Sequence, residues 1–260
     1  MHGLGNDFVV LDGRLEPVAM TQALAKALSD RHTGVGCDQL ILLGPSDKAA
    51  LRMDIWNNDG SPAEACGNAS RCVVALTGAA TIETEGGILE GAATGSDVTI
   101  SMGEPRFGWD DIPLAYPMDT ASLPMSWEGY GHPMALSVGN PHLVFFTNNI
   151  DEKSLRTIGP SIEGDPVFPE RINVNVASLT DGGVITLRTW ERGAGLTLAC
   201  GTGACATAVA AIVQKKAKSP VRVEMTGGAL TIEWAPGEPI RMTGPAIHVF
   251  TGDIDLEAFG

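Results

Sequence analysis

Two stretches of the chain carry the same short pattern, Glu64-Ala65-Cys66-Gly67-Asn68 and Leu198-Ala199-Cys200-Gly201-Thr202. In each, a cysteine and a glycine precede a run of small and apolar residues that is typical of a helix. We therefore predict that Cys66 and Cys200 each begin a helix. Since the two stretches occupy comparable positions in the two halves of the chain, they favour a duplicated domain, with one thiol from each half facing a shared cleft.

The overall composition limits the class of protein. A chain of 260 residues, 44% of them hydrophobic, is long enough for two globular domains. The net charge of −14 argues against nucleic acid or an anionic membrane as a partner, because both bind basic surfaces. The sequence has no apolar run long enough to span a bilayer and no basic-then-apolar leader, so we expect a cytoplasmic protein.

The cysteines indicate free thiols rather than disulfides or metal ligands. Five is an odd number, and cytoplasmic proteins rarely form disulfides. Cys66 and Cys72 are six residues apart and Cys200 and Cys205 five, and neither spacing matches a zinc or thioredoxin motif. The histidines occur singly, so we expect no metal. Cys37, Cys72 and Cys205 are predicted to be small core residues.

The hydrophobic pattern predicts an α+β fold. A helix is expected over 20–31 with Thr21 as its cap, and the helix after Cys200 is expected to continue to about Lys218, where Pro220 ends it. Short apolar runs bounded by turn residues predict strands at 9–11, 40–43, 143–146, 184–187, 221–224 and 230–234, with a strand-turn-strand unit over 86–102.

The proline-containing stretch 105–124 is the expected domain junction. We predict an N-terminal domain over 1–113, joined by a last strand over 249–260, and a C-terminal domain over 114–248. The two domains are expected to be pseudo-symmetric, each a mixed sheet wrapped around a long central helix, with the active site in the cleft between them.

Motifs spread over nearly the whole chain resemble those of the diaminopimelate epimerase family. They occur in the family's order, at residues 2–8, 34–36 with 38–39, 57–61 leading into 66–68, 139–142, 171–173, 191–195 and 199–206. The chain departs from the family pattern at Ala69, where glycine is usual, and at Leu196, where glutamate is frequent. Neither departure removes a residue with a proposed contact.

The resemblance implies that the protein inverts one α-carbon of diaminopimelate. This reaction interconverts the LL and meso forms for lysine and cell-wall precursor synthesis, and it uses no pyridoxal or other cofactor. Because the α-proton is very weakly acidic, positioned bases and preorganised electrostatics must do the work. A helix N-terminus can lower a cysteine pKa from about 8.5 to roughly 3.5–7.5. We therefore predict Cys66 and Cys200 as the catalytic pair, one removing the α-proton as a thiolate and the other donating from the opposite face as a thiol.

The two helix starts also provide candidate groups for the substrate α-carboxylate. Backbone N–H groups at a helix N-terminus bind anions, and glycine lets the backbone approach closely because it has no Cβ. The candidates are Gly67 and Asn68 in the first half and Gly201 and Thr202 in the second. Charge that develops on the carboxylate in the transition state would be stabilised there.

The family motifs imply further contacts at residues that would ordinarily be turn or surface residues. Arg192 is expected to bind a carboxylate through bidentate hydrogen bonds and Glu191 the amino group. His142 and Glu191 are expected to tune the cysteine pKa values. The polar contacts to the far amino-acid end of the substrate are predicted to be Asn6, Asn57, Asn140 and Asn173, with Gln39.

Two alternatives remain open at this stage. A proline or hydroxyproline racemase would use a similar thiol pair, but its smaller substrate would not need the distal asparagine contacts. A thiol redox or binding protein would use the cysteines as a switch, and its sign would be a close Cys-x-x-Cys pair, which the sequence lacks. The expected partner is the small-molecule substrate, with no nucleic acid or membrane, and the oligomeric state is open, with a homodimer as one possibility.

Overall fold

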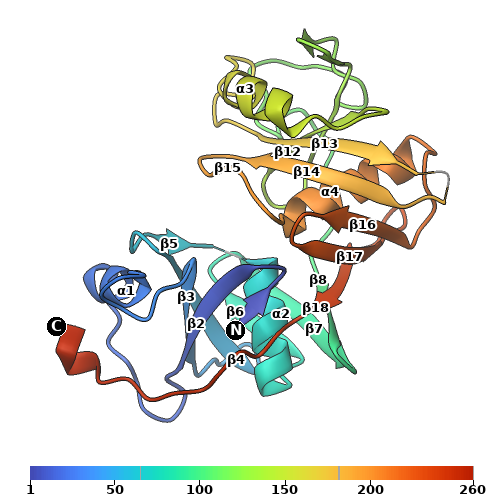
Figure 1. The fold of residues 1–260 in the computed structure, drawn as a ribbon. Helices are drawn as coiled ribbons and strands as arrows, with labels where there is room; N and C mark the ends of the chain where they lie inside the picture. The colour runs from blue at the N-terminus through green and yellow to red at the C-terminus, as the bar shows by residue number, and fades with distance from the viewer. Residues whose placement is uncertain (65, 181, 260) are drawn as a thin grey trace. The chain divides into compact units, whose positions relative to one another are not determined.

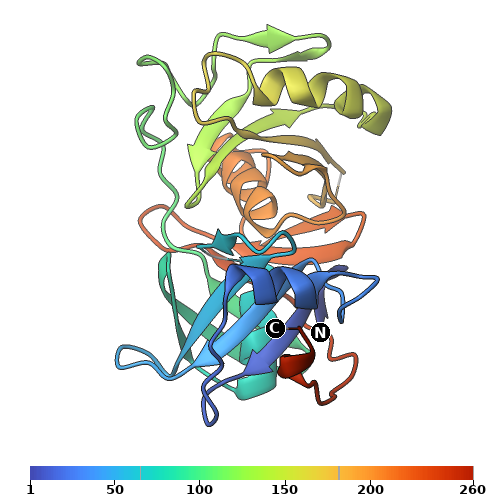
Figure 2. The ribbon, with the colours of Figure 1, turned by 90° about the vertical axis from the view of Figure 1, so that its left-hand side faces the viewer.

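The computed structural model describes residues 1–64, 66–180 and 182–259, and it divides into two compact units (Figures 1 and 2). Unit 1 comprises Met1–Ser101 and Gly244–Gly260, and unit 2 comprises Met102–Thr243. Each unit has a mixed sheet and a small number of helices, which confirms the predicted α+β class.

Unit 1 has a sheet with the strand order β1-β2-β3-β4-β6-β7-β8, with β5 paired to β4. Its helices are α1 (Gln22–Ser29) and α2 (Gly67–Thr77). Its strands are β1 (His2–Gly3), β2 (Asn6–Asp12), β3 (Gln39–Gly44), β4 (Leu51–Asn57), β5 (Pro62–Ala63), β6 (Thr81–Thr84), β7 (Gly87–Thr94) and β8 (Asp97–Ser101).

Unit 2 has a sheet with the strand order β11-β12-β13-β14-β16-β17-β18, with β15 paired to β14 and a separate β9–β10 hairpin. Its helices are α3 (Glu152–Glu163) and α4 (Gly201–Val213). Its strands are β9 (Ser126–Trp127), β10 (Tyr130–Gly131), β11 (Met134–Ser137), β12 (Pro141–Phe146), β13 (Asn173–Leu179), β14 (Ile185–Glu191), β15 (Gly195–Leu196), β16 (Val221–Met225), β17 (Gly228–Glu233) and β18 (Arg241–Pro245), whose last two residues belong to unit 1.

The two units have the same topology. In unit 1, β2 runs parallel to β3 and β4 parallel to β6, while the pairs β1–β2, β3–β4, β4–β5, β6–β7 and β7–β8 are antiparallel. Unit 2 repeats these relations from β11 to β18, with α3 in the place of α1 and α4 in the place of α2. The predicted pseudo-symmetric duplication is confirmed.

The two cysteine-led helices begin where the sequence predicted. Cys66 is the N-cap of α2 and Cys200 the N-cap of α4, both with extended backbone angles. The predicted end of α4 at about Lys218 is wrong, because the helix ends at Val213. Lys215 adopts a left-handed conformation (φ 57), and Lys216 N–H bonds to the Ala211 carbonyl, which closes the helix with a Schellman-type turn well before Pro220.

Most of the other predicted elements are present. Strands β2, β3, β12, β14, β16 and β17 occupy the predicted apolar runs, and β7, a turn and β8 fill 86–102. In α1, Thr21 is the N-cap, and its hydroxyl accepts a hydrogen bond from Leu24 N–H (3.1 Å).

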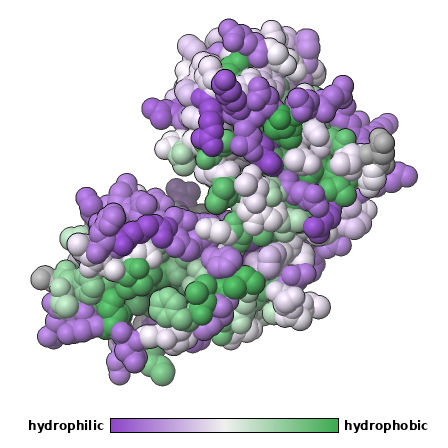
Figure 3. All heavy atoms as spheres, in the orientation of Figure 1, coloured by the Kyte–Doolittle hydropathy of each residue, from purple (hydrophilic) through white to green (hydrophobic). Residues whose placement is uncertain are grey.

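The structure adds α3, which the sequence analysis did not predict. Leu155, Ile158 and Ile162 lie on its buried face and contribute to the unit 2 core. Its other face is polar, and Figure 3 shows hydrophilic residues over the part of unit 2 where α3 lies in Figure 1. No helix in the described part of the chain is long and apolar enough to cross a membrane.

The boundaries of the two units differ in position from the predicted 113 and 248. Ile112, Leu114 and Leu123, from the proline-containing stretch, are buried in the unit 2 core, so this stretch packs with the domain that follows it. The chain returns to unit 1 at Gly244. Beyond it, Val249 and Phe250 are exposed, and the segment carries a short 3-10 helix, Leu256–Phe259, where a last strand was expected.

Candidate active site

In unit 1, the thiol of Cys66 lies among amide side chains. Cys66 is half-buried, and its Sγ lies 3.7 Å from Oδ1 of Asn6, the first residue of β2. Asn68, in the first turn of α2, donates from Nδ2 to the same oxygen (3.4 Å). Asn6 is held in turn by its own Nδ2, which donates to Asp38 Oδ2 (3.1 Å). The structure thus brings together three residues that the sequence analysis predicted for the site.

Arg71 supports this group from inside α2. Its side chain is fully buried, and it donates from Nη2 to Asn68 Oδ1 (2.8 Å) and from Nε to the Pro245 carbonyl (3.3 Å). The first contact fixes the Asn68 amide with its nitrogen toward Asn6. Arg71 was not among the predicted site residues, although an arginine inside an otherwise small and apolar helix segment is a signal of a buried polar role.

Gln39 and Asn57 form a second polar group in unit 1. They lie opposite each other where β3 begins and β4 ends, and Gln39 Nε2 donates to Asn57 Oδ1 (3.0 Å). Asn57 Nδ2 donates to Ser61 Oγ (3.1 Å). Within the described part of the chain, Gln39 Oε1 is buried without a hydrogen-bond partner. Such an acceptor is available to a ligand donor.

In unit 2, the thiol of Cys200 is almost fully enclosed. The residue is 4% exposed, and its Sγ accepts a hydrogen bond from Gly203 N–H (3.3 Å) and lies 3.5 Å from Thr202 Oγ1. Burial raises the pKa of Cys200 well above its usual value, and the nearby Glu191 carboxyl raises it further. The hydrogen bonds from Thr202 and Gly203 offset only part of this rise in the Cys200 pKa. The pKa of Cys200 is therefore raised although the residue caps a helix, because burial and Glu191 outweigh the hydrogen bonds that favour the thiolate.

Glu191, the last residue of β14, is the acidic neighbour of Cys200. Burial raises the pKa of Glu191, and the hydrogen bonds from Thr197 and Cys200 offset that rise in part. The Thr197 hydroxyl donates to Glu191 Oε1. The carboxyl and the thiol therefore lie in direct contact, and a change in the charge of one affects the other.

His142 and Asn140 lie at the start of β12 and connect to Cys200 through Thr202. His142 Nε2 is 2.8 Å from Asn140 Oδ1, and Asn140 Nδ2 is 3.4 Å from Thr202 Oγ1. Burial lowers the pKa of His142 to about 3, with a smaller contribution from the Arg192 charge. His142 is therefore a neutral imidazole. On its other side, Nδ1 lies 3.1 Å from Nδ2 of Asn175.

Asn175 is a buried polar residue that the sequence analysis missed. It lies two residues after Asn173 in β13, so the two side chains share one face of the strand. Both are almost fully buried, at 0% and 3% exposure. Two asparagines with strand spacing inside an apolar run were the available signal.

Asn173 contacts the backbone of Arg192 and not its guanidinium. Asn173 Nδ2 donates to the Pro141 carbonyl (2.9 Å), and Asn173 Oδ1 accepts from Arg192 N–H (3.0 Å). The Arg192 side chain is exposed, and its Nη1 donates to the Glu170 carbonyl (3.0 Å). In this conformation the guanidinium keeps most of its donors for another partner.

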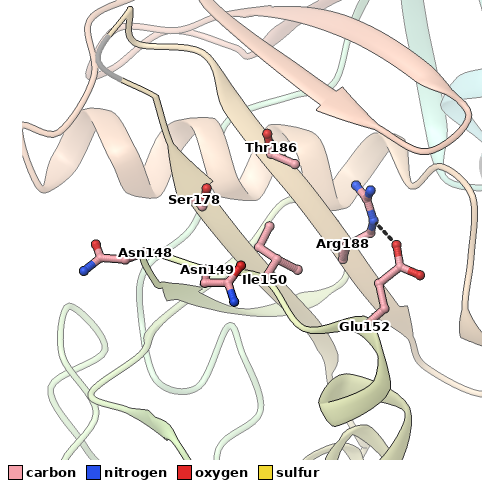
Figure 4. Close-up of a pocket in the computed structure, with 7 residues that line it drawn as sticks. All are labelled: Asn148, Asn149, Ile150, Glu152, Ser178, Thr186 and Arg188. Carbon is pink, nitrogen blue, oxygen red and sulfur yellow. Dashed lines mark hydrogen bonds and ion pairs between the residues drawn. The ribbon is translucent and has the colours of Figure 1, made fainter.

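A surface pocket elsewhere in unit 2 lacks the features of a reaction site (Figure 4). Its charged side chains, Arg188 and Glu152, pair with each other. It holds no thiol or histidine and is lined by Asn148, Asn149, Ile150, Glu152, Ser178, Thr186 and Arg188. Among residues 1–64, 66–180 and 182–259, no group of three or more His, Cys, Asp or Glu side chains is arranged to hold a metal ion.

The two cysteine sites occupy the same place in the duplicated fold. In unit 1, Asn6, Gln39 and Asn57 lie at the start of β2, the start of β3 and the end of β4, and all three precede the N-cap of α2. In unit 2, His142, Asn173 and Glu191 lie at the equivalent ends of β12, β13 and β14, before the N-cap of α4. The fold and these paired thiol sites define the class of α+β epimerases and racemases.

Solved structures of other proteins have a similar fold. A probable proline racemase from Agrobacterium radiobacter K84 aligns with a TM-score of 0.65 and 16% identity, covering 98% of this chain and 92% of that one. A phenazine biosynthesis protein of the PhzF family from Bacillus anthracis aligns with a TM-score of 0.64 and 17% identity, covering 96% and 93% of the two chains.

Sequence comparisons identify the family within this class. The family model for diaminopimelate epimerase matches residues 1–108 and 134–249. The diaminopimelate epimerase of Rhizorhabdus wittichii is 63% identical, covering 100% of this chain and 96% of the relative. That of Sphingopyxis alaskensis is 56% identical, covering 100% and 97%. The chain belongs to the diaminopimelate epimerase family and is an isomerase, which confirms the prediction made from the motifs.

Proposed function

We propose that the enzyme converts LL-diaminopimelate to the meso form with Cys66 and Cys200 as its acid/base pair, in the biosynthesis of lysine and cell-wall precursors. The observation that carries this proposal is the placement of one cysteine at the N-cap of each of the two equivalent helices, α2 and α4. One sulfur takes the α-proton and becomes a thiol. The other gives its proton to the opposite face of the same carbon and becomes a thiolate, so protons and charge balance.

The different surroundings of the two thiols support different roles at the start of the cycle. Burial and the Glu191 carboxyl raise the pKa of Cys200, so Cys200 begins as the thiol that donates. Cys66 is more exposed, so desolvation disfavours its thiolate less, and we assign it the role of the thiolate that abstracts. Once it holds the α-proton, its thiol donates to Asn6 Oδ1, the acceptor that faces the sulfur. In the reverse reaction the two residues exchange roles.

The helix starts supply electrostatic stabilisation for the intermediate. The first N–H groups of a helix have no partner within the helix and lie at the positive end of its dipole. We assign the N–H groups of Gly67, Asn68, Gly201 and Thr202 to the substrate α-carboxylate. When the α-proton leaves, negative charge spreads onto that carboxylate, and these donors bind it more tightly than in the ground state.

The remaining polar groups fit a substrate with a second amino-acid end. The unpartnered Gln39 Oε1 is an acceptor for an ammonium N–H, with Asn57 bonded beside it. The exposed Arg192 guanidinium is suited to a distal carboxylate, and Glu191 to the α-amino group. Asn6, Asn140 and Asn173 complete the proposed set. Proline has no such distal group, so these residues favour diaminopimelate as substrate.

The reaction also suggests where the enzyme works. An acid/base thiol must stay reduced to act. We therefore propose the cytoplasm, where thiols are kept reduced, as the location. The enzyme is proposed to need no cofactor, and a homodimer is its proposed oligomeric state.

The test is epimerisation of LL-diaminopimelate by the purified protein without added cofactor, followed by optical rotation, with L-proline as the alternative substrate. Cys66→Ala and Cys200→Ala should each lose nearly all turnover while remaining folded. The matched controls are Cys72→Ala and Cys205→Ala, which remove a fully buried thiol from the interior of the same helices. Near-normal turnover in either site variant would contradict the two-base mechanism, and turnover of proline alone would contradict the substrate.

A further inference from the structure

We propose that Asn175 is a positioning residue for Cys200, acting through a directed chain of hydrogen bonds that ends at the sulfur. This inference deepens the proposed function and rests on the role of Cys200 as proton donor. Asn175 lies outside the motifs that predicted the site. Each link of the chain joins side chains of unit 2.

The orientation of the Asn175 amide is fixed by its neighbours. One end of the amide lies 3.1 Å from the Leu143 carbonyl oxygen. A carbonyl can only accept, so this end must be the NH₂ group. The other end, Oδ1, accepts from the Thr189 hydroxyl (3.0 Å). Asn175 is fully buried, so water does not compete for either contact.

The orientation of Asn175 determines the tautomer of His142. Nδ2 of Asn175 has a second proton, and that proton faces His142 Nδ1 at 3.1 Å. Nδ1 must therefore be the unprotonated nitrogen. Since burial holds the pKa of His142 at about 3, the neutral ring carries its one proton on Nε2.

The tautomer in turn orients the rest of the chain. Nε2–H of His142 donates to Asn140 Oδ1 (2.8 Å), so the Asn140 amide nitrogen faces Thr202 Oγ1 (3.4 Å). The Thr202 oxygen accepts there, and its own proton is free to point at Cys200 Sγ, 3.5 Å away. A hydroxyl donor at this position stabilises the thiolate that forms when Cys200 gives up its proton.

Two charged residues lie near the chain without forming part of it. Glu191 contacts Cys200 and disfavours its thiolate, whereas the Arg192 charge disfavours protonation of His142. The thiolate of Cys200 therefore needs donors that offset both Glu191 and burial. The two that contact its sulfur are Gly203 N–H and the Thr202 hydroxyl. A His142 ring with its proton on Nδ1 would reverse every link and turn the Thr202 proton away from the sulfur.

The first test reads the tautomer directly in the wild-type enzyme. Nitrogen NMR of protein labelled at the histidine ring nitrogens distinguishes a protonated from an unprotonated ring nitrogen, and His142→Gln identifies the His142 signals among those of the five histidines. We expect His142 to be neutral with its proton on Nε2 at pH 7. A proton on Nδ1, or a doubly protonated ring, would overturn the proposal whether or not the enzyme is active.

The second test breaks the chain at each end. Asn175→Leu keeps the approximate volume but removes the donor to His142. It should abolish the single Nε2–H signature and lower kcat about ten- to a hundredfold, the scale of one hydrogen bond to an ionised group. Thr202→Val removes the last donor and should lower kcat by a similar factor even if Asn175→Leu does not fold. The control is Asn149→Leu at an exposed asparagine (Figure 4), which should change neither the His142 NMR signals nor kcat.

The combination of the two variants distinguishes a chain from general damage. If Asn175 acts through Thr202, the double variant should lose little more than the worse single variant. The proposal would be overturned if the fold-loss of kcat in the double variant equalled the product of the two single losses. It would also be overturned if Thr202→Val left kcat unchanged. A failure of the proposed function would be recognised by a different result. Cys200→Ala would then retain turnover, while His142 of the wild-type enzyme would still carry its proton on Nε2.

Discussion

Gly203→Ala is expected to destabilise the enzyme, although alanine favours a helix more than glycine does. Gly203 lies in the first turn of α4, directly after the residues that bind the substrate carboxylate in the proposed mechanism. A Cβ built at this position would lie 2.5 Å from Asn175 Oδ1 and 2.9 Å from Thr189 Oγ1. Both separations are shorter than Cβ contacts in real structures, so Asn175 and Thr189, or the helix, must move.

The magnitude follows from the groups that would have to move. Asn175 is held by the Leu143 carbonyl, by His142 and by Thr189, so a shift weakens bonds among buried groups. Overpacking of a core costs about 1–3 kcal/mol, and each buried polar group left unsatisfied costs about 1–3 kcal/mol. The helix propensity of alanine returns up to ~1 kcal/mol. We expect a net loss of about 2 kcal/mol, equivalent to a fall of roughly 4–8 °C in the thermal midpoint.

Thermal and urea unfolding of wild type and Gly203→Ala measure this loss, and kcat is expected to fall because the displaced Asn175 no longer fixes His142. The matched control is Gly44→Ala in β3, where a Cβ would meet nothing within 4 Å and the glycine has no left-handed backbone. That variant should stay within about 0.5 kcal/mol of wild type. A Gly203→Ala enzyme as stable and as active as wild type would refute the packing argument, since it would mean that the space beside Asn175 is open.

Two further predictions concern charge. Arg192→Lys should lower kcat/KM for diaminopimelate at least about tenfold, because lysine cannot form the bidentate contact proposed for the exposed guanidinium. The thermal midpoint should change little. Unchanged kcat/KM would remove Arg192 from the site. His142 has a folded-state pKa of about 3, below its ordinary 6.5, so its contribution to stability is present above pH 6.5 and is lost as the pH falls. Between pH 7.5 and 5 this loss should be about 2 kcal/mol, and urea unfolding of His142→Gln should lack that component.

The parts of the fold that sequence predicted are those set by local signals. Thr21 caps α1 as its residue type suggests, and the Cys-Gly pairs mark the starts of α2 and α4. The end of α4 was not predictable in this way, because Lys215 in a left-handed conformation has none of the backbone freedom that marks a glycine cap. Helix α3 was missed because Pro160 lies inside it, and only tertiary packing of its apolar face keeps the segment helical.

The candidate site was predicted at its motif residues and missed where burial decides the chemistry. Cys66, Asn68 and Asn6 were each predicted for the site, and the structure places them in contact, although Asn6 was expected at the far end of the substrate. The raised pKa of Cys200 was not predictable, since sequence indicates the helix N-terminus but not how completely the sulfur is enclosed. Asn175 was missed for the same reason, because an asparagine in a strand has no visible role until its buried partners are known.

The duplicated fold and the unequal sites together restrict how the proposed mechanism can work. Equivalent helix starts give both thiols the same local geometry, but the surroundings differ, with amides beside Cys66 and a carboxyl beside a buried Cys200. A reversible epimerase must pass through the state in which Cys200 is the thiolate. Each unit of pKa by which Cys200 lies above Cys66 costs about 1.4 kcal/mol in that state. Donors aimed at the Cys200 sulfur must therefore offset burial and Glu191 once the substrate is bound. This requirement gives the hydrogen-bond chain from Asn175 to Thr202 a function in turnover rather than only in stability.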